Sequence, residues 1–165
     1  LSIRRQRQMC IRDRSYSREE LGRGISLTRI YDKKFKSNCV KIAFISPLDE
    51  KTACVNAMLQ TVLVTSNAEI PSRTKLTSTL TGLYGSSIGT NCGTIGDYQS
   101  VGLSASFIGD DYTIDGEVIS VQVVRQLLNC LIRPHLVDGK FCEKYFTLRK
   151  QELIDAIVAL SLIHI

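Results

Sequence analysis

Two adjacent helices are predicted in the stretch SPLDEKTACVNAMLQTVLVTSNAEIPSRTKLTSTLTGLYG, residues 46–85. Pro47 ends the predicted strand that precedes the two helices. The Asp49 side chain can cap the first helix, because it can accept a hydrogen bond from a free amide of the first turn. Four apolar side chains of this helix recur at helical spacing and predict its buried face: Val55, Met58, Leu59 and Val62.

The second helix of the pair opens at Pro71 and Ser72. Gly85 stands where a left-handed residue commonly ends a helix, because glycine adopts that conformation without steric cost. Four side chains form the predicted buried face: Leu76, Leu80, Leu83 and Tyr84.

Alternating sequence on both sides of this helical pair predicts β-strands. Residues 25–31 are β-prone, and in 40–44 apolar residues alternate with Lys41 and Ala43. Residues 86–108 predict a hairpin, since Gly96 and Asp97 form a turn signal. Its second arm has one apolar face, made by Val101, Leu103, Ala105 and Phe107.

Two more helices are predicted after the hairpin. One runs from Asp115 to about Arg133, where Pro134 disfavours helical geometry, and its face holds Val121, Val124, Leu128 and Leu131. The other follows Asp138 and Gly139 and carries Phe146, Leu153, Ile157 and Leu160. The order ββααββαα predicts an α+β fold, a two-layer sandwich of a mostly antiparallel sheet with helices packed on one face.

The two ends of the chain resemble translated sequencing adapters, in MCIRDRS at 9–15 and SLIHI at 161–165. We therefore predict that residues 1–16 and 161–165 are adapter scars and that 24–160 form a single partial domain. The alternative is a natural basic arm that contacts nucleic acid or an anionic membrane. Two such strings at opposite ends of one chain favour the scar.

The charge of the chain depends on that choice. The whole chain carries +5, and residues 1–15, with five Arg and one Asp, account for +4 of it. The remainder is nearly neutral, so neither a nucleic-acid partner nor a membrane is predicted. Five cysteines outside the suspect ends are scattered without a CxxC pair, which favours free thiols in a reducing cytoplasm: Cys39, Cys54, Cys92, Cys130 and Cys142.

Local motifs give little further chemistry. The glycines between 82 and 96 lack the Gly-Lys-Ser/Thr of a phosphate loop and read better as turn and strand residues. His135 follows Pro134 in a short connection and is interpreted as a surface or turn residue. Asp110 and Asp111 lack the order of a calcium loop, so turn and capping roles are expected.

Taken together, the segments resemble the pitrilysin/insulinase family of zinc metallopeptidases, which use an inverted HxxEH motif. They are most similar to its non-catalytic bacterial branch, associated with modification of elongation factor P. The resemblance spans roughly 24–160 and rests on the order of six pieces: residues 46–50, 71–72, 83–85, 96–99, 104–108 and 151–155. It implies part of the N-terminal lobe of a protein whose two similar halves close around an extended peptide.

The resemblance also implies where zinc would bind, and that it does not bind here. Counted back from Pro71, the two histidines and the glutamate of the motif fall on Ala57, Thr61 and Gln60. A methyl, a hydroxyl and a neutral amide can neither hold zinc nor act as its base. A third ligand would fall near Asp155 or Ala156. No catalytic residue, metal or cofactor is therefore expected.

Two classes of function follow from the resemblance. The chain is either the inactive partner of a catalytic HxxEH homologue, shaping a shared chamber and holding peptide, or a stand-alone scaffold in the modification of a translation factor. An active metallopeptidase is the less favoured third reading.

Overall fold

The computed structural model describes residues 14–163, and the chain divides into two units at Lys36 and Ser37. The first unit contains the antiparallel hairpin of β1 (Arg14–Gly22) and β2 (Ile25–Asp32). Its turn includes Gly24 at a φ of 74°, a left-handed geometry that glycine adopts easily. A register shift lies just before this turn, between Glu20 and Gly22.

The second unit is built on a three-stranded antiparallel sheet in the order β3-β5-β4. Its strands are β3 (Ser37–Pro47), β4 (Ser87–Ile95) and β5 (Tyr98–Ile108). The central strand β5 pairs along its whole length with β3, and β4 joins it through the tight turn at Gly96 and Asp97. The predicted hairpin of residues 86–108 is therefore confirmed.

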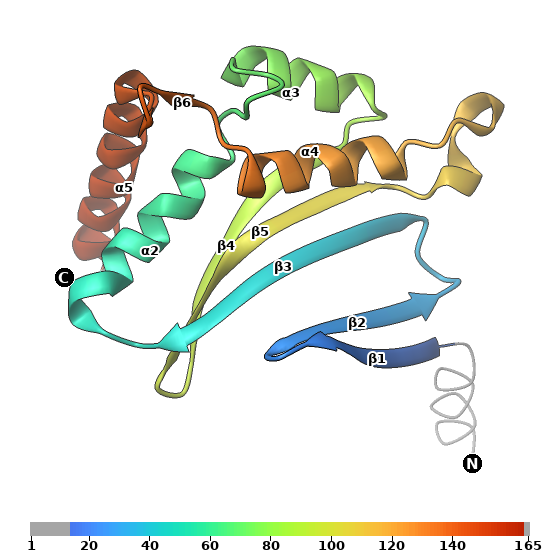
Figure 1. The fold of residues 1–165 in the computed structure, drawn as a ribbon, viewed down its shortest axis with the longest axis horizontal. Helices are drawn as coiled ribbons and strands as arrows, with labels where there is room; N and C mark the ends of the chain where they lie inside the picture. Colours follow the sequence, from blue (N-terminus) through green and yellow to red (C-terminus); the bar gives the residue numbers. More distant parts are fainter. Residues whose placement is uncertain (1–13, 164–165) are drawn as a thin grey trace. The chain divides into compact units, whose positions relative to one another are not determined.

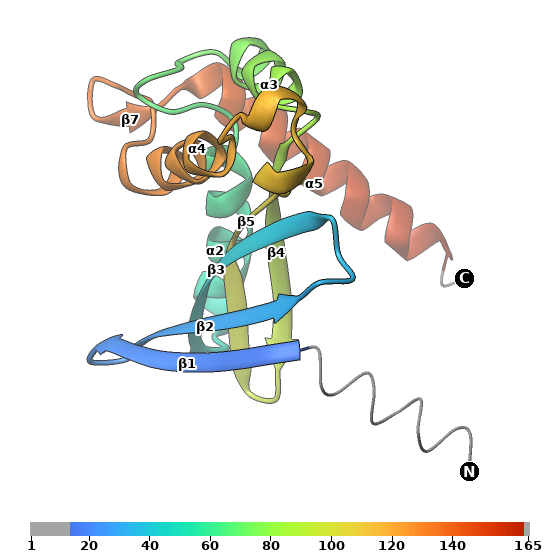
Figure 2. The ribbon, with the colours of Figure 1, turned by 90° about the vertical axis from the view of Figure 1, so that its right-hand side faces the viewer.

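Four α-helices accompany this sheet in the described part of the unit: α2 (Glu50–Leu63), α3 (Arg73–Gly82), α4 (Ser120–Ile132) and α5 (Glu143–Ile163). Asp49 caps α2 as predicted, Ser72 caps α3 where that helix was expected to open, and Gly85 follows α3 at a φ of 71°. Figures 1 and 2 both place α3 and α4 toward the same end of the sheet, and Figure 1 shows α5 running beside α2.

The hydrophobic core lies between one face of the sheet and the helices. Leu103, Ala105 and Phe107 alternate along β5 and are almost fully buried. They meet apolar side chains from the helices and their connections: Leu63, Ile70, Leu76, Leu80, Ile119, Val123, Leu127 and Cys130. The predicted α+β class, with helices on one face of an antiparallel sheet, is thus confirmed.

The predicted element order ββααββαα is not exactly matched. A strand, β1, precedes the two expected ones, and β2 pairs with β1 instead of with β3. Two short 3-10 turns, at Asp110–Tyr112 and Ile114–Gly116, precede α4, which begins at Ser120 and not near Asp115. A small hairpin of β6 (Leu136–Val137) and β7 (Lys140–Phe141) lies between α4 and α5.

Two predicted helix faces were only partly right. In α4, Val124 and Leu131 pack against the core as predicted, but Val121 is 67% exposed, and the fully buried positions are Val123, Gln126, Leu127 and Cys130. Apolar residues occupy two sides of α4, so periodicity alone could not choose the side that packs on the sheet. In α2, Val62 is buried as predicted, whereas Val55 and Leu59 are exposed and the other buried side chains are Gln60 and Leu63.

The last helix and the two chain ends differ in part from what the sequence predicts. Phe146 and Ile157 of the predicted α5 stripe are exposed, and Leu153 is half-buried. Of the predicted scars, residues 1–13 and 164–165 lie outside the described residues, while 14–16 begin β1 and 161–163 continue α5. Within residues 14–163, no helix is long and apolar enough to cross a membrane.

Candidate functional site

A pair of buried polar contacts joins α2 to the central strand. The side-chain oxygen of Gln60 accepts a hydrogen bond from the backbone amide of Gly102 at 3.1 Å. Gln60 is only 4% exposed, so this bond satisfies an amide oxygen that would otherwise be costly to bury. The helix is therefore tied to β5 by a side chain of its buried face.

A second glutamine makes the reciprocal connection from the strand. Gln99 of β5 donates from Nε2 to the carbonyl oxygen of Ala53 at 2.9 Å, and its Oε1 accepts from Asn56 Nδ2 at 3.0 Å. Asn56 and Gln60 lie one turn apart on α2, and Gln99 and Gly102 lie three residues apart on β5. Side-chain amides of Asn56, Gln60 and Gln99 therefore lie between α2 and β5.

Glycine is required at position 102 by the neighbouring strand. A Cβ atom at Gly102 would lie 1.9 Å from the backbone carbonyl oxygen of Ile42. A backbone atom of a paired strand cannot move away without breaking the ladder of hydrogen bonds. Gly102 thus allows β3 and β5 to approach closely while its own amide turns toward Gln60.

The residues at the zinc positions implied by the resemblance do not fit zinc. Ala57 offers a methyl group, Gln60 is engaged with Gly102, and the Thr61 hydroxyl donates to the Met58 carbonyl oxygen at 2.7 Å. Zinc in a peptidase needs imidazole and carboxylate donors, and its bound water needs a basic carboxylate nearby. Among residues 14–163, no three His, Cys, Asp or Glu side chains are grouped as metal ligands.

The position of the implied third ligand lies on the exposed side of α5. Asp155 is exposed and accepts a hydrogen bond from Gln151 one turn earlier, at 2.8 Å, and Ala156 is also exposed. Arg149 of α5 instead donates from Nε to Thr65 Oγ1, just past the end of α2, at 3.3 Å. The described geometry does not bring Asp155 into a ligand set with the α2 positions.

A cavity of about 480 Å³ opens beside Gln60. It lies between α2, the helix-facing side of β3 and β5, and α4, and ten residues line it: Phe44, Ser46, Asn56, Leu59, Gln60, Leu63, Val101, Gly102, Leu103 and Leu131. No charged side chain is among them. Phe44 is 51% exposed and Leu59 is 42% exposed, so two large apolar side chains of this cavity face solvent.

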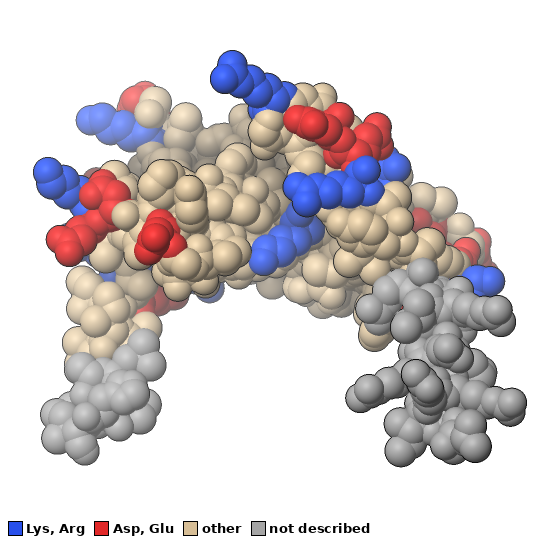
Figure 3. Space-filling view, turned by 90° about the horizontal axis from the view of Figure 1, so that it is seen from below, with Lys and Arg blue, Asp and Glu red and all other residues tan. Residues whose placement is uncertain are grey.

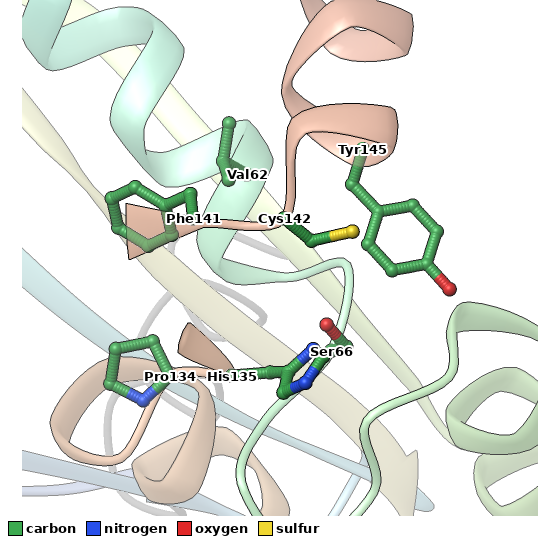
Figure 4. Close-up of a pocket in the computed structure, with 7 residues that line it drawn as sticks. All are labelled: Val62, Ser66, Pro134, His135, Phe141, Cys142 and Tyr145. Carbon is green, nitrogen blue, oxygen red and sulfur yellow. The ribbon is translucent and has the colours of Figure 1, made fainter. Parts of the chain in front are cut away.

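His135 lies in a different, much smaller cavity of about 10 Å³, with room for one water molecule. Figure 4 shows its ring beside Ser66, with Cys142 and Tyr145 across the cavity at the start of α5. The Nδ1 atom of His135 is buried and has no hydrogen-bond partner within the described residues. The predicted turn position is correct, but the side chain is half-buried rather than on the surface.

Asp110 has the capping role expected from the sequence. Its carboxylate accepts hydrogen bonds from the amides of Ile119 and Ser120, each at 2.9 Å, and from the Ser120 hydroxyl at 2.5 Å. The hydroxyl bond is the main cause that holds the pKa of Asp110 below its usual value, and the amide bonds act in the same direction. Asp110 therefore stabilises the start of α4.

The five cysteines of the described region are free thiols. Cys130 is fully buried, and burial raises the pKa of its thiol while a hydrogen bond from Asn67 opposes that shift. Cys142 is half-buried, and the other three are exposed.

The surface in one view carries charges of both signs, and an exposed face of α4 is apolar. Lys and Arg stand among Asp and Glu in the view of Figure 3, surrounded by uncharged residues. On α4, part of the predicted buried face is exposed, and Val121 and Leu128 line a shallow groove together with the half-buried Val124. This face presents apolar surface in place of a basic patch.

Sequence reasoning missed Asn56, Gln99 and Gly102. One signal was present, because Gln99 shares a strand face with Val101, Leu103, Ala105 and Phe107, where a polar residue needs a partner. The partner was beyond reach of the sequence, since it lies 43 residues away in the chain.

Comparisons with known proteins identify the fold without a function. No protein-family model and no curated protein matches the sequence. The chain is similar in structure to a conserved protein from Enterococcus faecalis V583, with a TM-score of 0.80 and 23% sequence identity. The match covers 87% of this chain and 34% of that one, so this chain spans about a third of that protein's length.

Proposed function

We propose that this chain is a peptide-binding lobe of a catalytically inactive insulinase-family homologue, and that it acts as the non-catalytic partner of an active HxxEH protein in the cytoplasm. The proposal combines the resemblance in sequence with two structural features. The first feature is that Ala57, Gln60 and Thr61 of α2 carry no zinc-binding or basic group. The second is that the edge strand β4 is uncharged.

The residues at the implied zinc positions of α2 lack the groups that a zinc peptidase needs. An amide at Gln60 has no basic lone pair to take a proton from water, and its oxygen is already bound to Gly102. Ala57 and Thr61 supply no imidazole. Restoring the HxxEH residues alone would require three substitutions, and position 60 now holds a contact that joins α2 to β5.

The observation that carries the binding role is the uncharged edge strand β4. Its nine residues, SIGTNCGTI, contain no charged residue and no proline. Within the three-stranded sheet β4 pairs only with β5, so one side of its backbone has no strand partner there. Proteins usually protect such edges with Lys, Pro or a bulge, and an unprotected edge can pair with an extended peptide.

Fluorescence anisotropy tests this role with a short labelled peptide that alternates Val and Thr around a central Phe. We expect saturable binding, and amide hydrogen exchange should slow in β4 when the peptide is present. A control with proline at alternate positions of the peptide should bind at least tenfold more weakly, because it cannot complete a strand ladder. Binding without slower exchange in β4 contradicts strand addition.

The second candidate is a stand-alone scaffold in translation factor modification. The apolar groove on α4 favours some protein partner without distinguishing the two candidates. Co-purification of the chain from its host separates them. A stoichiometric complex with an HxxEH protein supports the partner role, and a complex with a different enzyme supports the scaffold.

A further inference from the structure

We infer that the cavity beside Gln60 receives one large apolar side chain of an extended peptide, and that Asn56 and Gln60 bind the main chain of that same residue. The inference rests on the proposed peptide-binding function and adds to it a preferred residue class and a subsite separate from the β4 edge, since no β4 residue lines the cavity. The lining of the cavity and two unused hydrogen-bonding atoms support it.

The lining defines the class of side chain. Six of the ten residues around the cavity are large and apolar: Phe44, Leu59, Leu63, Val101, Leu103 and Leu131. The volume of about 480 Å³ lies within the range of small-ligand pockets. Since no charged residue lines it, a charged side chain would lose its hydration without gaining an ionic partner. An aromatic or long aliphatic side chain fits these conditions.

Two polar atoms at the cavity are unused. Gln60 bonds through Oε1, which leaves its Nε2 as a donor, and Asn56 bonds through Nδ2, which leaves its Oδ1 as an acceptor. Neither atom has a hydrogen-bond partner within the described residues. Neither is among the buried unpaired atoms of that part of the chain, which belong to Asn91 and His135. Both are therefore open to a bound molecule.

The pair of atoms favours a peptide over other apolar ligands. Asn56 and Gln60 are four residues apart and so lie on the same side of α2. In an extended chain, the N–H and C=O groups of one residue point to the same side. One acceptor and one donor next to an apolar cavity match those two groups together with the side chain between them. A hydrocarbon would leave both amide atoms unpaired, which disfavours it.

Fluorine NMR measures this binding with acetyl-Gly-X-Gly-amide, in which X is para-fluorophenylalanine. Addition of the full chain should broaden and shift the fluorine resonance. In labelled protein, the Gln60 side-chain NH₂ and the Gly102 amide should shift as well. The same peptide with Ala at X should bind at least tenfold more weakly. An analogue in which an ester oxygen replaces the N–H of X should bind about fivefold more weakly, because Asn56 Oδ1 then has no N–H group from which to accept a hydrogen bond.

A matched pair of variants locates the subsite. Leu59→Trp fills the cavity and should weaken binding at least tenfold. Val55→Trp, one turn earlier on α2 and outside the lining, should leave the affinity within twofold of the original. Both positions are exposed, so both variants should fold, and melting temperatures check this.

The outcomes separate this inference from the proposed function. Loss of binding in Leu59→Trp alone, together with the Ala and ester effects, supports the subsite. Equal binding of the Phe and Ala peptides with shifts confined to β4 overturns the subsite and leaves the peptide-binding lobe standing. Binding of the ester at full strength, or of fluorotoluene as tightly as the peptide, overturns main-chain recognition. Failure of this peptide and of the longer Val/Thr peptide overturns both proposals.

Discussion

Gln60 and Gly102 form one contact between α2 and β5, a hydrogen bond of 3.1 Å from a strand amide to a helix side chain. Gln60 stands at the position implied for a catalytic glutamate, and Gly102 stands where the backbone of β3 leaves no room for a side chain. The pair joins α2 to the central strand of the sheet, and the stability of variants at both positions tests this contact.

Substitution of Gly102 by Ala should destabilise the protein by more than about 3 kcal/mol, because its Cβ would overlap the Ile42 carbonyl oxygen. Chemical denaturation followed by circular dichroism measures the change in the free energy of unfolding. Gly93→Ala in β4 is the matched control, since a Cβ there meets nothing within 4 Å. Equal stability of the two variants would show that β3 does not approach β5 as described.

Substitution of Gln60 by Glu should cost about 1–3 kcal/mol at neutral pH, because it buries a carboxylate without a cationic partner. Burial raises the pKa of the new carboxyl in the folded state. The loss should therefore be large above that raised pKa and should shrink as the pH falls and the group is protonated. Denaturation at several pH values checks this. Gln122→Glu on the exposed side of α4 should show no such trend, and a Gln60→Glu variant as stable as the original at pH 8 would contradict the buried contact.

Loss of the Asp110 carboxylate should weaken the start of α4. Asp110→Asn removes a charge that accepts hydrogen bonds from Ile119 and Ser120, at an expected cost of about 1 kcal/mol. The pKa of Asp110 is lowered on folding, so its contribution is present above the ordinary pKa near 3.8 and is lost as the pH falls through the lower folded value. Thermal melts between neutral and strongly acidic pH measure it. Asp111→Asn, at an exposed neighbour, should be nearly neutral, and equal losses in both variants would contradict the capping role.

Substitution of Asn67 by Ala should destabilise the connection between α2 and α3 by about 3 kcal/mol. Asn67 is fully buried, donates to Gln126 Oε1 at 2.9 Å and accepts from the amides of Glu69 and Ile70. Its removal leaves several buried groups without partners. Exposed Asn38→Ala provides the control for chemical denaturation. A loss below about 0.5 kcal/mol would contradict the buried network.

Local patterns predicted much of this fold from the sequence. The caps at Asp49 and Ser72 and the hairpin turn at Gly96 depend on neighbouring residues, so short stretches specify them. The buried side of α4 depends on its packing against β5, which is distant in the chain, and only part of it was predicted: Val124 and Leu131 pack against the core, whereas Val121 and Leu128 are exposed.

In the candidate site, too, contacts between distant parts of the chain could not be predicted from the sequence. The resemblance implies that Ala57, Gln60 and Thr61 stand at the HxxEH positions. The contact of Gln60 with Gly102 could not be predicted, because hydrophobic periodicity treats a glutamine as a surface residue. A buried amide becomes favourable only when the fold supplies its partner.

The most direct test of the central claim is a combined binding and cleavage measurement on the full chain. The labelled Val/Thr peptide is incubated with the protein, with added zinc and separately with a chelator, and anisotropy is followed by mass spectrometry of the peptide. We predict saturable binding that neither zinc nor chelator changes, with the peptide recovered intact. Cleavage that requires zinc and stops with chelator, in a protein that holds one zinc ion per chain, would contradict the account.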